Sequence, residues 1–315
     1  MNDWLYILLG LLAALFLVLV YISIRYVNRI LYPKTRTYES AKEKIRRQGY
    51  FPEAYLESLT YNEFRIPSPY GYLLYGRVYP APSKNFVILV HGITMNIYGA
   101  LKYLPFFYSK GFNVVVFDLR NHGQTGGPNT TYGHFEKWDL SAVTDYLYTT
   151  YGQDIHIGVH GESMGGAISI LHMGMDPRVE FGIIDCAFSD LSELLLLKLK
   201  QDSGIKSKKL LQLVNQFIKS KSGFSIEDVS PVKEVPSIKK PILFIHGTQD
   251  TYIPPMMAKA MYAFKVENKF LYLAEGGEHS TAMAVDPQRY DEEITRFLNI
   301  VYPRMHFTPG NLPPS

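Results

Sequence analysis

The sequence predicts an α/β fold in which helices flank a mostly parallel central sheet, with a helical cap insertion and an N-terminal transmembrane helix. Three observations lead to this prediction. Short runs rich in β-branched and aromatic residues alternate with runs of helical character, which is typical of βαβ units. Most of the strand runs are apolar throughout, as in strands buried on both faces. The chain also begins with a long uncharged segment.

The N-terminal segment from Trp4 to Ile24 is long enough to cross a bilayer. Its 21 uncharged residues, at about 1.5 Å per residue, span a hydrocarbon core of roughly 30 Å. A cleaved signal peptide is the first alternative, but Asp3 precedes the span and a basic n-region is missing. A buried core helix is the second alternative, and 21 uncharged residues exceed its usual pattern. Residues 1–30 are therefore predicted to be a membrane anchor.

Basic side chains gather just after this span. Residues 1–47 contain eight basic and three acidic side chains, and all eight basic ones follow Ile24. The positive-inside rule then predicts a single-pass protein of the cell membrane with its body on the cytoplasmic side. Residues 31–59 are interpreted as a basic juxtamembrane linker, which anionic headgroups would attract.

The composition of the remaining chain excludes several classes. From residue 48 onward there are 24 basic and 26 acidic side chains, so the basic stripe that nucleic acid requires is missing and no nucleic-acid partner is expected. The single cysteine, Cys186, excludes an intramolecular disulfide and a cysteine-based metal cluster. A hydrophobic content of 47% over 315 residues excludes disorder for most of the chain.

The body is predicted to cover residues 60–302, followed by a C-terminal tail at 303–315. It opens with an antiparallel hairpin from Phe64 to Pro80, interrupted by a turn signal at residues 68–71. Six buried strands are then expected at Phe86–Val90, Asn113–Phe117, Ile155–Val159, Phe181–Ile184, Pro241–Ile245 and Lys269–Leu273. The helices between and after them are expected at Met95–Lys110, Glu136–Tyr151, Met164–Met175, Pro255–Phe264 and Pro287–Val301.

A long insertion at about 187–230 interrupts this alternation. Leu210, Leu213, Val214, Phe217 and Ile218 follow the i, i+3, i+4, i+7, i+8 spacing of an amphipathic helix. The insertion is therefore predicted to be a helical cap whose apolar stripe lies over the strand ends. The alternative is a further layer of core helices.

Ser163 is the candidate nucleophile. It lies between a predicted strand and a predicted helix in the sequence His160-Gly161-Glu162-Ser163-Met164-Gly165-Gly166, which contains the pattern G-x-S-x-G. A serine on such a tight turn needs glycines two positions before and two positions after it, here Gly161 and Gly165, because side chains there would clash as the hydroxyl is brought into the open. The alternative is an ordinary glycine-rich loop.

A serine hydroxyl is a weak nucleophile, so a base must accept its proton and an acid must orient that base. Asp250 follows the strand that ends at Ile245, and His279 follows the strand that ends at Leu273. Asp185 also ends a strand and is the alternative acid. The predicted triad is Ser163, Asp250 and His279.

Acyl transfer also needs backbone N–H groups that stabilise an oxyanion. The amide of Met164 is one candidate, since it begins the helix after Ser163. The amide of Ile93 is the other, in the His91-Gly92-Ile93-Thr94 loop after the first buried strand.

Other polar residues near these positions are expected to have structural roles. Glu162 and Glu278 flank the candidates and are expected to be solvated or locally hydrogen-bonded carboxylates. Cys186 is expected to be a small buried apolar group. Six further histidines of the body are expected in structural or loop positions, namely His91, His122, His156, His160, His172 and His246.

These residues resemble the serine α/β-hydrolase superfamily over roughly residues 60–300. The matching motifs, in chain order, are His91-Gly92, Asp118-Leu119-Arg120-Asn121-His122-Gly123, Gly161-Glu162-Ser163-Met164-Gly165-Gly166, His246-Gly247-Thr248-Gln249-Asp250 and Glu278-His279. More narrowly, the chain resembles the membrane-anchored bacterial YqkD-like hydrolases. The resemblance implies an α/β-hydrolase fold, with Ser163, Asp250 and His279 as nucleophile, acid and base and with Ile93 and Met164 as oxyanion donors.

The predicted activity is hydrolysis of carboxylic esters through an acyl-serine intermediate, which needs no metal or organic cofactor. The substrate is expected to be a small-molecule or lipid-like acyl ester, since an apolar cap and a membrane anchor favour a hydrophobic acyl group. Two alternatives remain: an acylaminoacyl-type peptidase, and a catalytically silent membrane-bound interaction module. The residues specify neither the leaving group nor the oligomeric state.

Overall fold

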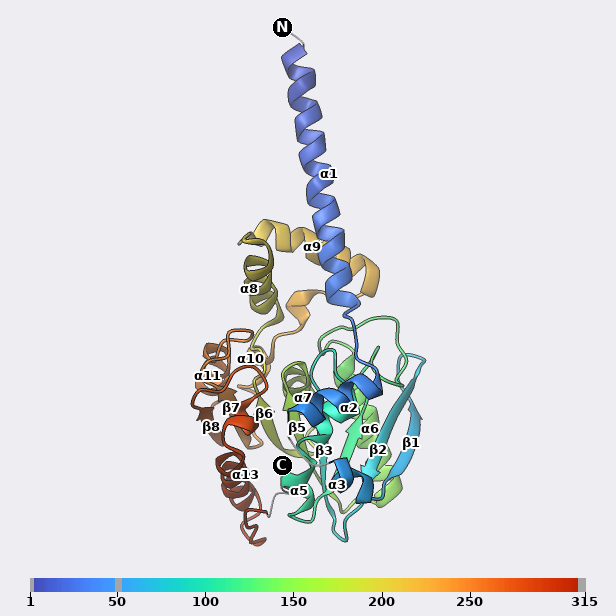
Figure 1. Ribbon diagram of the computed structural model, residues 1–315, viewed down its shortest axis with the longest axis vertical. Helices are drawn as coiled ribbons and strands as arrows, with labels where there is room; N and C mark the ends of the chain where they lie inside the picture. Colours follow the sequence, from blue (N-terminus) through green and yellow to red (C-terminus); the bar gives the residue numbers. More distant parts are fainter. Residues whose placement is uncertain (1–2, 49–52, 311–315) are drawn as a thin grey trace.

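An eight-stranded sheet forms the centre of the body, in the order β1-β2-β4-β3-β5-β6-β7-β8 (Figure 1). The computed structural model describes residues 3–48 and 53–310. β2 is antiparallel to both β1 and β4, and all other neighbouring strands are parallel. The prediction of a mostly parallel sheet is confirmed. The strands are β1 (Asn62–Pro67), β2 (Leu73–Tyr79), β3 (Asn85–Val90), β4 (Asn113–Phe117), β5 (His156–Glu162), β6 (Val179–Asp185), β7 (Ile242–Gly247) and β8 (Lys269–Ala274).

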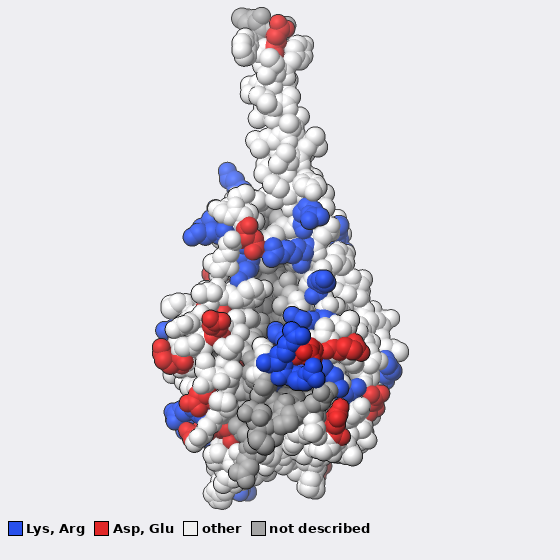
Figure 2. Space-filling view, in the orientation of Figure 1, with Lys and Arg blue, Asp and Glu red and all other residues white. Residues whose placement is uncertain are grey.

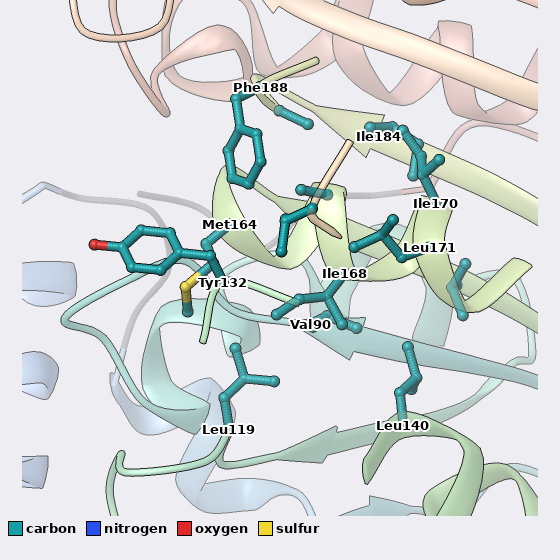
Figure 3. Packing of buried hydrophobic residues seen from close by; sticks show 14 of the residues in the cluster. Val90, Leu119, Tyr132, Leu140, Met164, Ile168, Ile170, Leu171, Ile184 and Phe188 are labelled. Carbon is teal, nitrogen blue, oxygen red and sulfur yellow. The ribbon is translucent and has the colours of Figure 1, made fainter. Parts of the chain in front are cut away.

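Helices cover both faces of the sheet, because strand side chains alternate between two hydrophobic clusters. On β3, Phe86, Ile88 and Val90 belong to one cluster, and Val87 and Leu89 belong to the other. Figure 3 shows the first cluster around α7. Its helices include α6 (Glu136–Tyr151), α7 (Met164–Met175) and α11 (Met256–Phe264). The second cluster includes α4 (Ile97–Leu101), α5 (Leu104–Tyr108), α12 (Ala282–Val285) and α13 (Pro287–Val301).

The helices α6, α7 and α13 have the ranges predicted from the sequence. The predicted single helix Met95–Lys110 is wrong, because the chain breaks there into α4 and α5. Pro105 has no N–H to continue α4, but it fits the first turn of α5. At the break, the side chains of Lys102 and Tyr103 turn into the protein and contact Glu162.

The insertion between β6 and β7 is helical, as predicted. It contains α8 (Leu191–Ser203), α9 (Lys208–Ser222), the short 3₁₀ helix η1 (Ile226–Asp228) and α10 (Pro231–Glu234). Leu211, Val214 and Ile218 of α9 are buried in the same cluster as Val27 and Leu31 at the end of the first helix, α1. The apolar stripe of α9 therefore packs against α1, whereas the sequence suggested that it lies over the strand ends.

The helix α1 (Asp3–Leu31) projects from the body (Figure 1). Its most apolar stretch has a mean hydropathy of 2.9, and 6% of that stretch is buried. The side chains of Trp4 and Leu17 are 80% and 65% exposed. By length and composition α1 is able to cross a membrane, and a signal sequence would meet the same criteria.

The stretch 31–59, interpreted from the sequence as a linker, contains the helices α2 (Tyr38–Arg47) and α3 (Glu53–Ser58). The Thr37 side chain caps α2 by accepting a hydrogen bond from the Ser40 amide at 3.2 Å. Ala41 and Ile45 of α2 are buried in the second cluster, so this helix is packed onto the body. Residues 1–2 of the predicted anchor, 49–52 of the predicted linker and 311–315 of the predicted tail lie outside the described residues.

Candidate active site

Ser163 occupies the turn between β5 and α7. Its backbone has φ 57° and ψ −118°, a conformation that costs a non-glycine residue on the order of 1–3 kcal/mol. Two glycines allow this turn, since a Cβ on Gly161 would lie 2.3 Å from the carbonyl oxygen of Gly165. A Cβ on Gly165 would lie 2.1 Å from the carbonyl oxygen of Val90. The turn is thus pressed against β3, and this packing holds Ser163 in its strained conformation.

The structure brings Ser163, His279 and Asp250 together in a row. The Oγ of Ser163 lies 3.0 Å from the Nε2 of His279. The Nδ1 of His279 lies 2.7 Å from the Oδ2 of Asp250. The three residues follow β5, β8 and β7 respectively, and the carboxyl ends of these parallel strands meet at one edge of the sheet.

The surroundings of Asp250 fix the tautomer of His279. The carboxylate is 3% exposed and accepts hydrogen bonds from the amides of Tyr252 at 2.9 Å and Ile253 at 2.8 Å. Burial raises its pKa, but hydrogen bonds from His246 and His279 lower it more, so the pKa of Asp250 lies well below its usual range. An ionised carboxylate only accepts hydrogen bonds. The Nδ1 of His279 therefore donates to Asp250, and its Nε2 is free to accept the proton of Ser163.

Both candidate oxyanion donors lie next to Ser163. Met164 is the first residue of α7, where the amide has no intrahelical acceptor. Ile93 lines the same cavity as Ser163. The loop that carries it approaches the nucleophile closely, since a Cβ on Gly92 would lie 3.3 Å from the Cβ of Ser163.

A cavity of about 290 Å³ opens beside Ser163 and His279. Helix α2, the loop after β3 with α4, the turn after β5 and the loops after β7 and β8 contribute residues to it. It is lined by Lys44, Ile45, Gln48, Gly92, Ile93, Thr94, Met95, Gly99, Lys102, Glu162, Ser163, Tyr252, His279 and Ser280. The wall formed by α2 and the residue after it was not anticipated, because the sequence analysis treated this stretch as a linker.

Hydrogen bonds hold the segment before α2 against the loop after β3. The amide of Arg36 donates to the carbonyl oxygen of Thr94 at 2.8 Å, and the side-chain amide of Asn96 donates to the carbonyl oxygen of Arg36 at 3.2 Å. The hydroxyl of Tyr38 donates to the carboxylate of Asp118. The chain between α1 and α2 is therefore braced against the loop that carries a candidate oxyanion donor.

A buried ion pair joins the nucleophile's strand to the loop of His279. The side chains of Lys102 and Glu162 are 5% and 8% exposed and contact each other directly. Lys102 also donates to the carbonyl oxygen of Ser280 at 3.3 Å, and Tyr103 donates to Glu162 at 2.5 Å. Burial raises the pKa of Glu162, but the charge and hydrogen bond of Lys102 and the hydrogen bond from Tyr103 lower it below its ordinary value.

The expectation of a solvated or locally hydrogen-bonded carboxylate at Glu162 needs correction, since Glu162 is buried and its partners Lys102 and Tyr103 are distant in the chain. The sequence contains one signal for this buried ion pair, the lysine within the apolar run Leu101-Lys102-Tyr103-Leu104. A lysine there is exposed or has a buried acidic partner, and the partner lies 60 positions later in the chain.

The alternative acid, Asp185, is fully buried next to this ion pair. It accepts a hydrogen bond from the hydroxyl of Tyr290 at 3.1 Å, and the hydroxyl oxygen of Tyr103, whose proton is donated to Glu162, lies 3.2 Å from it. Burial, and then the nearby charge of Glu162, raise its pKa to about 6. Since His279 is hydrogen-bonded to Asp250, the geometry favours Asp250 as the orienting acid.

Cys186, Asp250 and His279 offer potential metal-ligand atoms within 4.8 Å of one another. The thiol fits this role poorly, because burial and the neighbouring carboxylates Asp185 and Glu162 raise the pKa of Cys186 well above its usual value. A cysteine binds a metal as the thiolate, and Asp250 and His279 are already hydrogen-bonded to each other. The arrangement suits proton transfer better than metal binding.

Comparison with known proteins assigns the same architecture. A family model described as alpha/beta hydrolase fold matches residues 85–173, which include Ile93 and Ser163. The uncharacterized Bacillus subtilis protein YqkD is 35% identical over 289 residues, which are 91% of this chain and 95% of YqkD. The Arabidopsis thaliana alpha/beta hydrolase domain-containing protein WAV2 is 30% identical over 48% of each chain.

Solved structures agree with the assignment. The Pyrococcus furiosus esterase Pf2001 superposes with a TM-score of 0.64 and 26% identity, covering 79% of this chain and 94% of the esterase. A puromycin-hydrolyzing peptidase of Mycobacterium tuberculosis shares the fold at a TM-score of 0.63 and 19% identity, covering 84% of this chain and 42% of the peptidase.

We expect Gly165→Ala to lower the rate at which a fluorophosphonate labels Ser163 by roughly 100-fold or more. The new methyl group would clash with the Val90 carbonyl and displace the turn that carries Ser163. A displacement of about 1 Å at a reacting group can lower the rate about 100-fold. The matched control is Gly174→Ala on the same helix, where the methyl group meets only the flexible side chain of Glu234. Equal labelling rates in both variants would contradict the proposed role of the turn.

We expect Lys102→Met to lower the free energy of unfolding by about 3–5 kcal/mol at pH 7, because it leaves the Glu162 charge buried without its cation. In the parent protein the pKa of Glu162 is depressed, so the pair stabilises the fold above about pH 4.5. This contribution is lost as the pH falls through the folded-state pKa.

The difference in free energy of unfolding between Lys102→Met and the parent protein should therefore be smaller at pH 4 than at pH 7. Thermal unfolding at both pH values measures it. Lys84→Met provides the control, because it breaks only the exposed pair with Asp154 and should leave the free energy of unfolding nearly unchanged at both pH values. A difference for Lys102→Met that is equally large at both pH values would argue against the ion-pair explanation.

Proposed function

Because this chain belongs to the α/β-hydrolase superfamily, we propose that it is a membrane-anchored serine hydrolase that cleaves carboxylic esters. The observation that carries the proposal is the row of contacts at 3.0 Å and 2.7 Å from Ser163 through His279 to Asp250. This row lies at a strained strand-to-helix turn beside a cavity. The likeness to the Pyrococcus furiosus esterase adds support for ester chemistry.

In the proposed acylation, the Oγ of Ser163 attacks the carbonyl carbon of the ester while its proton passes to the Nε2 of His279. The negative charge that develops on the carbonyl oxygen is stabilised by the amides of Met164 and Ile93. The tetrahedral intermediate then collapses, the ester bond breaks, and the alcohol leaves with the proton held by His279. Asp250 stabilises the imidazolium during this step.

In the proposed deacylation, water takes the place of the alcohol. His279 removes a proton from the water as the oxygen attacks the acyl-serine carbonyl, and a second tetrahedral intermediate forms. Collapse of this intermediate returns the proton to Ser163 and releases the carboxylic acid. The low pKa of Asp250 keeps its charge in place throughout both steps.

We also propose that α1 anchors the protein in the membrane. Its length, its mean hydropathy of 2.9 and its exposed apolar side chains support this role. Arg25 and Arg29 lie in the last two turns of α1, and the helix α2 that follows carries four more basic residues. Cations on this side of the span favour a cytoplasmic body.

The first test is labelling of the full-length protein with a fluorophosphonate probe, which reacts rapidly only with an activated serine. We expect labelling at Ser163 and turnover of short p-nitrophenyl esters. Ser163→Ala should lose labelling and lower turnover by roughly 10⁶-fold, because removal of the nucleophile alone costs about as much as removal of the whole triad.

Ser222→Ala on α9 serves as a control, and thermal unfolding should show that both variants remain folded. Undiminished ester turnover by a folded Ser163→Ala variant would disprove the proposed mechanism.

The second test concerns orientation. Protease added to intact cells should leave the body uncut, and permeabilised cells should lose it to the same protease. Extraction with alkaline carbonate should leave the protein in the membrane fraction. Digestion of the body in intact cells would place it on the opposite side of the membrane, and release by carbonate would mean that α1 is no anchor.

A further inference from the structure

The charges around the active-site cavity do not balance. Among the described residues that line it, Lys44 and Lys102 are cationic and Glu162 is anionic. Lys102 and Glu162 neutralise each other through their direct contact. The charge of Lys44 therefore remains in excess on a wall of the cavity that contains Ser163 and His279.

Lys44 differs from the other cations of α2. Lys42 lies 3.9 Å from the carboxylate of Glu57, and both Arg46 and Arg47 contact Glu43. Within the described part of the chain, by contrast, no ion pair involves Lys44. Figure 2 shows Lys and Arg side chains gathered over α2 in the middle of this face. Of these four, only Lys44 lines the cavity.

The surroundings of Lys44 favour binding of an anion. The Lys44 side chain is exposed to solvent, but the surrounding protein still lowers the pKa of its ammonium group by desolvation; Glu162 raises this pKa, and the nearby cations Arg36 and Lys102 lower it again. The ammonium group thus lies among charges that do not fully compensate it. An anionic group in the cavity would supply the missing counter-charge, and the amide of Gln48 beside it offers a further hydrogen-bond donor.

The size and lining of the cavity also bear on the substrate. A volume of about 290 Å³ lies at the lower end of the roughly 300–1,000 Å³ that is usual for small-molecule sites. Polar side chains of Thr94, Ser280 and Tyr252 contribute to the lining. The apolar stripe of α9 packs on α1 and not on this cavity. Apolar side chains of Ile45, Ile93 and Met95 line the cavity as well, so a substrate that carries both an anionic group and a short acyl chain would match it.

We propose that Lys44 is a specificity-determining residue that binds an anionic group, a carboxylate or a phosphate, on the ester substrate. This inference rests on the proposed function, since it assumes that Ser163 attacks an ester in this cavity. The anionic group belongs either to a water-soluble ester or to the headgroup of a lipid, and the two sources share the same recognition chemistry.

The experiment measures kcat/KM of the full-length, detergent-solubilised protein for two matched pairs of esters. The first pair is mono-4-nitrophenyl glutarate and neutral 4-nitrophenyl pentanoate, which places the charge on the acyl side. The second is 1-butanoylglycerol 3-phosphate and neutral 1-butanoylglycerol, which places a lipid-headgroup phosphate on the alcohol side. The pair that shows an anionic preference identifies the source of the anion.

We expect the ratio of anionic to neutral kcat/KM to exceed 10 in at least one pair. Lys44→Gln should lower that ratio roughly 10- to 100-fold, the factor that a hydrogen bond to a charged group provides. Lys44→Arg should retain most of it. Lys42→Gln on the same helix should leave the ratio unchanged, because Lys42 does not line the cavity.

Fluorophosphonate labelling of Ser163 distinguishes failure of the proposed serine hydrolase function from failure of the inference about Lys44. Absence of labelling in the parent protein would contradict the proposed serine hydrolase function itself. A labelled protein that shows no anionic preference in either pair, or that keeps its preference after Lys44→Gln, overturns the inference about Lys44 and leaves the serine hydrolase proposal standing.

Discussion

The carbonyl oxygen of Val90 lies so close to Gly165 that only a residue without a Cβ fits between β3 and the turn after β5. This contact, together with the approach of Gly161 to the carbonyl of Gly165, presses the turn onto the sheet. The strained backbone of Ser163 is maintained because relaxing it would separate the turn after β5 from β3, against which it is packed. The loop after β3 and the start of α7 are brought to the same hydroxyl by this one packing constraint.

The buried pair of Lys102 and Glu162 adds a second constraint at the same place. A buried ion pair is stable only while its geometry is kept, because separating the charges leaves each one without compensation. Lys102 contacts Glu162, which precedes Ser163, and the carbonyl of Ser280, which follows His279. The pair therefore opposes relative movement of the nucleophile and its base.

The N-terminal region connects the proposed anchor to the site. The end of α1 packs into the same hydrophobic cluster as α9, and the next residues form hydrogen bonds to the loop that carries Ile93. Helix α2 then forms one wall of the cavity and contributes Lys44. With α1 in a bilayer, the membrane surface and the cavity are joined by the stretch between α1 and Lys44, which the hydrogen bonds of Arg36 and the burial of Ala41 attach to the body.

The sequence by itself determined the approximate positions of the strands, their mostly parallel orientation and the ranges of α6, α7 and α13, because hydrophobic periodicity and glycine positions are local properties of the chain. It also identified Ser163, Asp250 and His279 as candidates, since each follows its own strand and the ends of parallel strands meet. Only the tertiary structure decided that α2 walls the cavity, that the predicted helix Met95–Lys110 breaks in two, and that Lys102 pairs with Glu162. The sequence carries local signals for two of these features, Pro105 in the predicted helix and Lys102 in an apolar run. It does not specify the contacts themselves, because the partners lie far apart in the chain.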